Sequence, residues 1–156
     1  MSFFRKQASI IAIFVCYLLL TACDETKVVQ CNKLIQVVNK GNALIDSKKD
    51  NSDVASTKNL ANALNKTAKE LDTLDLTETN LKGFQTRLSK GFRELSEPLN
   101  DMAKALDTGK NASTTSEGRE QIEKAKKDLA KAGQAANKAA KNQDALTSKL
   151  AVYCSK

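Results

Sequence analysis

The chain has 156 residues, with 25 Lys and Arg against 18 Asp and Glu, a formal net charge of +7, no histidine, no tryptophan and only 4% aromatic residues. The absence of histidine removes the commonest general base, the commonest metal ligand and the usual axial ligand of haem. Nothing places two carboxylates, or a serine and a lysine, in a local motif suggestive of catalysis. The sequence therefore predicts a protein that is not an enzyme, has no small-molecule substrate and holds no metal or other cofactor.

The first residues have the pattern of an export signal. Arg5 and Lys6 form a short basic region, and residues 8–20 form an apolar run of the length of a secretory signal rather than of a full membrane span. The run closes in Leu20-Thr21-Ala22-Cys23.

That closing stretch resembles the lipobox of bacterial lipoproteins, in which a cysteine follows two small residues and a branched aliphatic residue. The resemblance covers residues 1–23 and implies that the Cys23 thiol takes a diacylglyceryl group and that the chain is cut before this residue. Two or more acyl chains anchor a protein stably. We therefore expect a cleaved signal peptide at 1–22, a lipidated tether at 23–26, and a domain at 27–156 that faces the periplasm or the cell exterior. The alternatives are an uncleaved helical anchor and an ordinary signal peptide cut at another small residue.

Loss of residues 1–22 would leave 134 residues with a net charge of about +5, because Arg5 and Lys6 leave with the signal. This length favours a single domain, and a composition dominated by Ala, Leu, Lys and Asn favours helices.

The four cysteines have separate fates. Cys16 would be removed with the signal peptide and the Cys23 thiol would carry the lipid, which leaves Cys31 and Cys154. In an exported and therefore oxidising context such a pair predicts a disulfide. The alternatives are two reduced buried thiols, or half of a metal site that would need two further ligands.

Apolar residues recur every three or four positions over residues 26–47 and again from about 53 to 73, which predicts two amphipathic helices. The polar segment 47–52 separates them, and Ser52 or Asp53 can cap the second helix. The two apolar stripes are Val28, Cys31, Leu34, Ile35, Val38 and Ile45, and then Val54, Leu60, Ala61, Leu64, Ala68 and Leu71.

After a turn at 72–80, the longest apolar stripe in the chain predicts a third helix at 81–106. Pro98 lies inside it, so we expect a kink, or a fresh start capped by Ser96. A turn at 107–113 follows, with Gly109 available as a left-handed C-cap. The stripe consists of Leu81, Phe84, Leu88, Phe92, Leu95, Leu99, Met102 and Leu106.

Thr114 and Glu117 have the spacing of a capping box, which predicts the start of a fourth helix that continues to about residue 153. Its inward positions follow a repeat of about seven residues whose middle is mostly alanine, so it can approach a neighbouring helix closely. These positions are Ile122, Ala125, Leu129, Ala132, Ala136, Ala139, Leu146, Leu150 and Tyr153.

Four amphipathic helices with short turns predict an all-α, antiparallel up-down-up-down bundle, in which Cys31 and Cys154 share one end. Because about eight residues join Cys23 to Cys31, a tether of at most roughly 28 Å would keep that end near the membrane. The third and fourth helices are longer than the first two, so we expect them to project as a hairpin. The alternatives are a break near Gly133 or Asn142, or a longer first helix. The hairpin would be lined by Leu99, Met102, Leu106, Ile122 and Leu129.

One face of the fourth helix carries a basic ridge, defined by Lys124, Lys127, Lys131, Lys138 and Lys141. The ridge could contact an acidic envelope protein, an anionic polymer or lipid headgroups. The alternative is a solvated face. Nucleic acid is not expected as a partner, because no aromatic residues interleave the lysines.

Two looser resemblances concern the whole helical part. The Ala/Lys-rich run at 124–141 is similar to the repeats of desiccation-protective helical proteins, and a lipid-anchored, disulfide-closed bundle is similar in outline to secretin pilotins. Neither resemblance carries a site residue to this chain. The leading hypothesis is a membrane-anchored binding or scaffolding module of the bacterial envelope, and the alternative is a structural or stress-protective lipoprotein without a defined partner.

Overall fold

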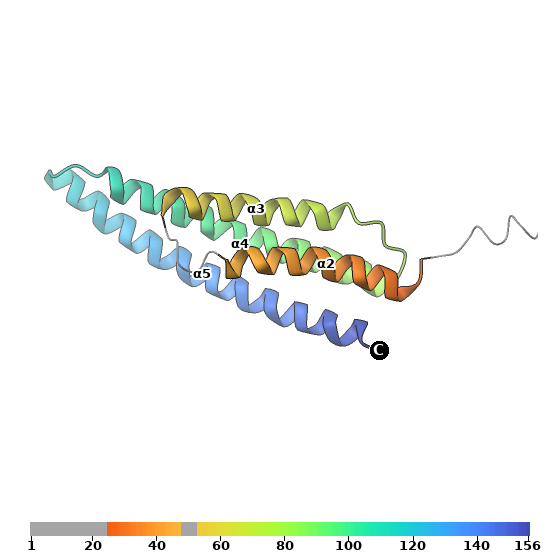
Figure 1. Ribbon diagram of the computed structural model, residues 1–156. Helices are drawn as coiled ribbons and strands as arrows, with labels where there is room; N and C mark the ends of the chain where they lie inside the picture. Colours follow the sequence, from red (N-terminus) through yellow and green to blue (C-terminus); the bar gives the residue numbers. More distant parts are fainter. Residues whose placement is uncertain (1–24, 48–52) are drawn as a thin grey trace, which may run out of the picture.

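The computed structural model describes residues 25–47 and 53–156. The predicted signal peptide at 1–22, Cys16, Cys23 and residues 48–52 of the polar segment lie outside these ranges. The helices of the described chain are α2 (Lys27–Asp46), α3 (Val54–Asp72), α4 (Thr79–Asn111) and α5 (Ser116–Cys154). Successive helices run in opposite directions along one long axis (Figure 1), which confirms the predicted up-down-up-down bundle.

The most extensive helix–helix interfaces in the bundle are formed by α4. It packs against α3 on one side and α5 on the other, whereas α2 contacts all three at the end where α5 finishes (Figure 1). The large core side chains lie where α2 completes the bundle. Completely buried leucines and phenylalanine there each contribute roughly 1.5–3 kcal/mol through loss of apolar surface from water. They are Leu34, Leu64, Leu71, Leu81, Leu88, Phe92 and Leu150.

The hairpin of α4 and α5 extends past the ends of both α2 and α3 (Figure 1), as the unequal helix lengths predicted. α5 is continuous through Gly133 and Asn142, so the predicted alternative of a break there is wrong. Its alanine positions 125, 132 and 139 are buried at intervals of seven residues, and they let α5 lie close to α4. The predicted lining residues are all half-buried: Leu99, Met102, Leu106, Ile122 and Leu129.

α4 begins earlier and ends later than the predicted range of 81–106. The Glu78 carboxylate caps its start by accepting from the Leu81 backbone N–H at 2.7 Å. At the other end Gly109 lies inside the helix, and no glycine of the described residues has a positive φ. The predicted left-handed cap at Gly109 is therefore wrong, because α4 continues as far as its packing against α5 does, with Gly109 beside Ala125.

α4 also continues through Pro98, so the predicted fresh start at Ser96 is wrong. The Ser96 hydroxyl instead donates to the Ala61 carbonyl of α3 at 2.8 Å and is buried in the interface between the two helices.

The cap of α5 is displaced by one residue from the predicted capping box of Thr114 and Glu117. Thr115 is the N-cap, and its hydroxyl accepts from the Gly118 backbone N–H at 3.2 Å. A Cβ at Gly118 would lie 1.9 Å from the Ser113 carbonyl oxygen, so the connection at 112–115 folds over a position that only glycine fits. The other predicted cap is confirmed: Asp53 accepts from the Ser56 backbone N–H at 2.9 Å at the start of α3.

Candidate functional site

The predicted disulfide closes the end of the bundle where α2 begins and α5 finishes. Cys31 and Cys154 are bonded with an S–S distance of 2.08 Å and a Cα–Cα distance of 5.8 Å, across 123 positions of sequence. The pair joins the second turn of α2 to the last residue of α5. We call this part of the molecule the disulfide end.

A buried glutamine, which sequence reasoning missed, fastens the disulfide end to the connection between α3 and α4. The Gln30 side-chain oxygen accepts from the backbone N–H groups of Thr77 at 2.8 Å and Glu78 at 3.0 Å. Its amide nitrogen donates to the Thr77 hydroxyl and to the Glu25 carbonyl oxygen. In the sequence Gln30 is only a polar residue directly before Cys31, and such a residue would ordinarily be placed on the outer face of the helix. Its position next to Cys31 is the one signal that could have indicated its buried role.

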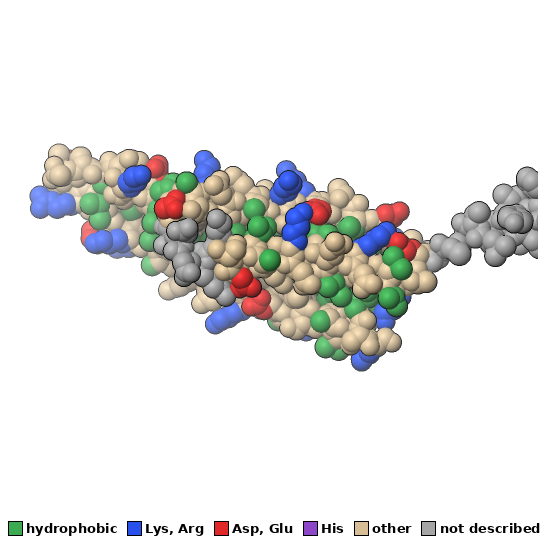
Figure 2. All heavy atoms as spheres, in the orientation of Figure 1, with side chains coloured by type: hydrophobic (Ala, Val, Ile, Leu, Met, Phe, Trp, Pro, Cys, Tyr) green, Lys and Arg blue, Asp and Glu red, His purple; other side chains and the backbone are tan. Residues whose placement is uncertain are grey.

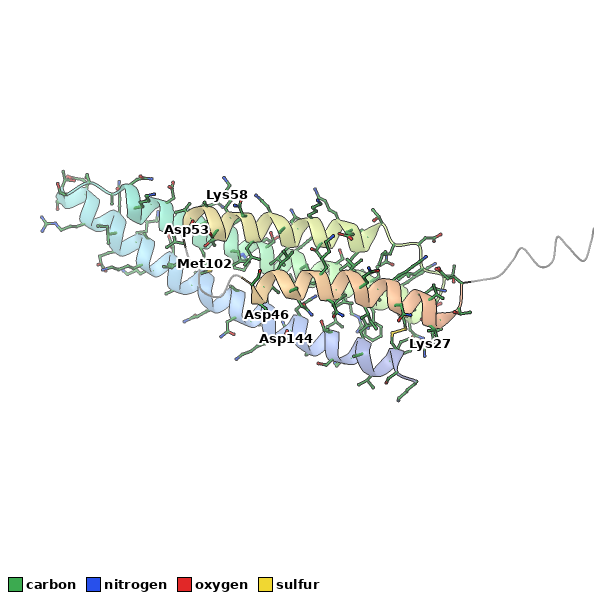
Figure 3. The ribbon with its side chains drawn as sticks, in the orientation of Figure 1. Lys27, Asp46, Asp53, Lys58, Met102 and Asp144 are labelled. Atoms are coloured by element: carbon green, nitrogen blue, oxygen red, sulfur yellow. A yellow bond between two sulfur atoms is a disulfide. The ribbon has the colours of Figure 1, made fainter. Side chains whose placement is uncertain are left out.

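Tyr153 completes the disulfide end. Its ring lies 5.6 Å from the Phe84 ring, centroid to centroid, and the Lys27 ammonium lies 4.2 Å from its centroid in a cation–π contact. The Asn80 amide nitrogen donates to the Tyr153 hydroxyl at 3.2 Å. Side chains from α2, α4 and α5 are thus ordered around one aromatic residue, and Figure 3 labels Lys27 at this end.

The expected lipid-attachment residue, Cys23, lies outside the described residues. It precedes Lys27, the first residue of α2, by four positions. The chain therefore enters the bundle at the disulfide end, and the α4–α5 hairpin is at the opposite end (Figure 1).

The five lysines of the predicted basic ridge are all exposed on α5, and one of them, Lys131, also borders a hollow between α4 and α5. The packed side of α5 carries the buried residues Ala125, Ala132, Ala139 and Leu150, which leaves the ridge on the outer surface. Next to the ridge, a hydrogen bond and the charge of Lys126 lower the pKa of Glu123, and the charge of Lys127 adds to this effect.

A hollow of about 470 Å³ opens between α4 and α5, and Pro98 is among its lining residues. Its acidic groups are exposed and alternate with lysines, and Lys104 contacts Asp101 at 3.0 Å. The charged lining residues are Glu94, Glu97, Asp101, Lys104, Asp128 and Lys131.

Gln143 of α5 is buried, with 1% of its surface exposed, and it faces Gly91 of α4. Neither polar atom of its side-chain amide has a hydrogen-bond partner in the protein, and the same holds for the Asn42 side-chain oxygen and the Thr147 hydroxyl. A Cβ at Gly91 would lie 2.0 Å from the Gln143 side-chain oxygen, so Gly91 provides the space that this amide occupies.

Over residues 25–47 and 53–156, no group of three or more His, Cys, Asp or Glu side chains could hold a metal ion. Within the same ranges, no helix is both long enough and apolar enough to cross a membrane. Comparison of the chain with protein-family models, with curated proteins and with solved structures gives no match.

Proposed function

We propose that the protein is a membrane-anchored helical lipoprotein of the bacterial cell envelope that acts as a non-enzymatic binding or scaffolding module. The observation that supports this proposal best is the position of the lipobox-like cysteine. In the sequence Cys23 precedes by four residues the start of α2, which lies at the disulfide end, so a lipid on Cys23 would hold this end near the bilayer and direct the α4–α5 hairpin away from it.

Attachment of lipid is tested by metabolic labelling with radioactive palmitate. The wild-type protein should incorporate the label, and Cys23→Ser should not, because the thiol that accepts the diacylglyceryl group is gone. Cys16→Ser is the matched control and should label like the wild type. Labelling of Cys23→Ser at the wild-type level would refute the anchor.

The surface proposed for binding is the basic ridge of α5, which presents exposed lysines along one side of the longest helix. An acidic protein or an anionic envelope polymer would complement this charge. The surface is continuous with the projecting hairpin, where a partner could reach it without crossing the disulfide end.

Binding is tested by reversing three ridge charges together, in Lys124→Glu, Lys131→Glu and Lys138→Glu. The matched control reverses three exposed lysines of α3, in Lys58→Glu, Lys66→Glu and Lys69→Glu. A partner cross-linked in envelope extracts should be retained by the wild type and by the α3 control and lost from the ridge variant. Retention by all three proteins would refute the ridge, and failure of all three to retain any partner would favour the structural or stress-protective alternative.

A further inference from the structure

The largest exposed apolar side chains of the described residues are gathered at one end of the bundle. Val28 is 65% exposed, Val29 42% and Val152 59%. The first two lie in the first turn of α2 and the third lies in the last turn of α5, and the Cys31–Cys154 bond joins the second turn of α2 to that last turn. Three β-branched side chains are therefore in water around the disulfide end, although the rest of the described surface is dominated by charged and small residues.

The valines have neighbours that are typical of a membrane–water interface. Tyr153 lies half-buried beside Val152, and Lys27 covers its ring at 4.2 Å. Lys149 and Lys156 are exposed within two turns of Val152. Figure 2 shows hydrophobic, basic and acidic side chains together at the end where α2 begins. Tyrosine at the headgroup level, apolar side chains below it and lysines toward the lipid phosphates form the usual pattern of interfacial contact.

The acidic groups at this end are largely engaged by the protein itself. Glu25 pairs with Lys33 at 2.7 Å, and Glu78 caps α4 while accepting from the Asn80 side chain. Asp75 remains as an exposed carboxylate on the connection between α3 and α4. Among the described residues, the unpaired charge around the valines is therefore mainly positive, which suits an anionic lipid surface.

The occupant of this surface is indicated by the path of the chain. Only residues 24–26 stand between Cys23 and α2, and the apolar run at 8–20 precedes Cys23 in the sequence. Whichever of the two holds the protein in the bilayer, the disulfide end is the part of the bundle that reaches the lipid first.

We infer that the disulfide end is a membrane footprint: Val28, Val29 and Val152 enter the headgroup region of an anionic bilayer, while Lys27, Lys149 and Lys156 contact lipid phosphates. The inference takes the location of the protein at a membrane from the proposed function, but the footprint does not require acylation of Cys23. The bundle then rests on the bilayer by its end, and the α4–α5 hairpin is held away from the lipid.

The chain contains no tryptophan, so a single introduced tryptophan reports its own surroundings. The full chain carrying Val152→Trp or Val28→Trp is reconstituted in vesicles of phosphatidylglycerol and phosphatidylethanolamine that contain lipids brominated near the headgroup end of the acyl chains. Both reporters should show blue-shifted emission and quenching. Thr114→Trp, exposed at the tip of the hairpin, is the matched control and should show neither. Emission and quenching equal to those of the Thr114→Trp protein at both reporter sites would overturn the footprint.

The electrostatic part of the inference is tested by exchanging phosphatidylglycerol for phosphatidylcholine, which should lower the quenching of Val152→Trp several-fold. Unchanged quenching would refute the lysine contacts. In the Val152→Trp protein, Val28→Asp with Val29→Asp should lower quenching by an order of magnitude because both side chains would resist burial. Unchanged quenching here would refute insertion of the α2 valines.

The footprint and the proposed lipid anchor can fail separately. Quenching of Val152→Trp in a protein that incorporates no palmitate would support the footprint and refute the anchor. Palmitate incorporation without quenching at either reporter would leave the anchor standing and overturn the footprint.

Discussion

Two buried glutamines show how different the environment of one residue type can be in this bundle. Gln30 uses both polar atoms of its amide, with four hydrogen bonds to Glu25 and to the α3–α4 connection. Gln143 is as deeply buried, but its amide has no partner in the protein. Burial of a polar group is compensated only where its hydrogen bonds are replaced, so the two residues should affect stability in opposite ways.

We expect Gln143→Met to raise the free energy of unfolding by about 1–2 kcal/mol, because methionine has nearly the same volume and no polar group to desolvate. Gln30→Met, the matched control, should lower it by about 1–3 kcal/mol, because it removes the partner of two backbone N–H groups. Urea unfolding followed by circular dichroism measures both. A loss of stability in Gln143→Met as large as that in Gln30→Met would contradict this account.

The helix cap at Asp53 makes stability depend on pH. The backbone N–H of Ser56, and then its hydroxyl, donate to the Asp53 carboxylate and lower its pKa from the ordinary value of 3.8. A pKa that is lower in the folded state gives a stabilisation that is present above the ordinary pKa and is lost as the pH falls through the folded-state pKa.

Asp53→Asn keeps an equally good N-cap without a titrating group. Between about pH 5 and about pH 2 we therefore expect the melting temperature of the wild type to fall further than that of Asp53→Asn. Glu94→Gln, at an exposed position on α4, should follow the wild type. Parallel curves for the wild type and Asp53→Asn would show that the cap does not titrate in this range.

At the scale of the helices, close approach depends on small residues at particular crossings. Gly41 of α2 is buried against the Phe92 ring of α4, and a Cβ at this position would lie 2.4 Å from the ring. Gly133 of α5 has no neighbouring atom within 4 Å of the corresponding point. Both glycines are in helix interiors, where glycine is unfavourable relative to alanine, so only the packing distinguishes them.

The pair Gly41→Ala and Gly133→Ala separates packing from helix propensity. Gly133→Ala should raise the free energy of unfolding by about 0.5–1 kcal/mol. Gly41→Ala should lower it by about 1–3 kcal/mol, because the Phe92 ring is completely buried and has little room to move. Thermal unfolding of the two variants measures the difference, and a stabilised Gly41→Ala protein would show that α2 can move away from α4 at little cost.

The whole molecule is built around α4, and α2 is its most weakly attached helix. Besides apolar packing, the contacts that hold α2 include the Gln30 hydrogen bonds, the Lys27 contact with the Tyr153 ring, the surface ion pair of Lys40 with Glu70 at 2.7 Å, and the Cys31–Cys154 bond. Exposed ion pairs contribute little. The Cys31–Cys154 disulfide is therefore the strongest constraint on α2, which is the helix that would follow a membrane anchor in the chain.

Removal of the disulfide by Cys31→Ala with Cys154→Ala should lower the free energy of unfolding by about 4–5 kcal/mol, as expected for a closed loop of this length. Amide hydrogen exchange should then increase earliest and most in α2, and later in α3, α4 and α5. Uniform exchange across the four helices would show instead that the bundle opens as one unit. Cys16→Ala is the matched control.

Much of the architecture follows from the sequence alone. The spacing of apolar residues predicts four helices, their order and their alternating direction, because an amphipathic helix must bury its apolar side. The two cysteines that remain at opposite ends of the helical part then predict which ends meet. The lengths of the third and fourth helices predict the hairpin, and the continuity of α4 through Pro98 and of α5 through Gly133 and Asn142, which the sequence had left open, comes from the structure.

Only the tertiary structure decided the details that depend on a neighbouring helix. Gly109 continues α4, Ser96 donates to α3 instead of starting a helix, and Thr115 replaces Thr114 as a cap, because in each case packing or backbone approach outweighs a local signal. The roles of Gln30 and Gln143, and the gathering of three valines at the disulfide end, likewise come from residues far apart in the sequence. The physical reason is that the spacing of apolar residues shows which side of a helix is buried. Hydrogen-bond partners and surface patches depend instead on which parts of the other helices lie beside it.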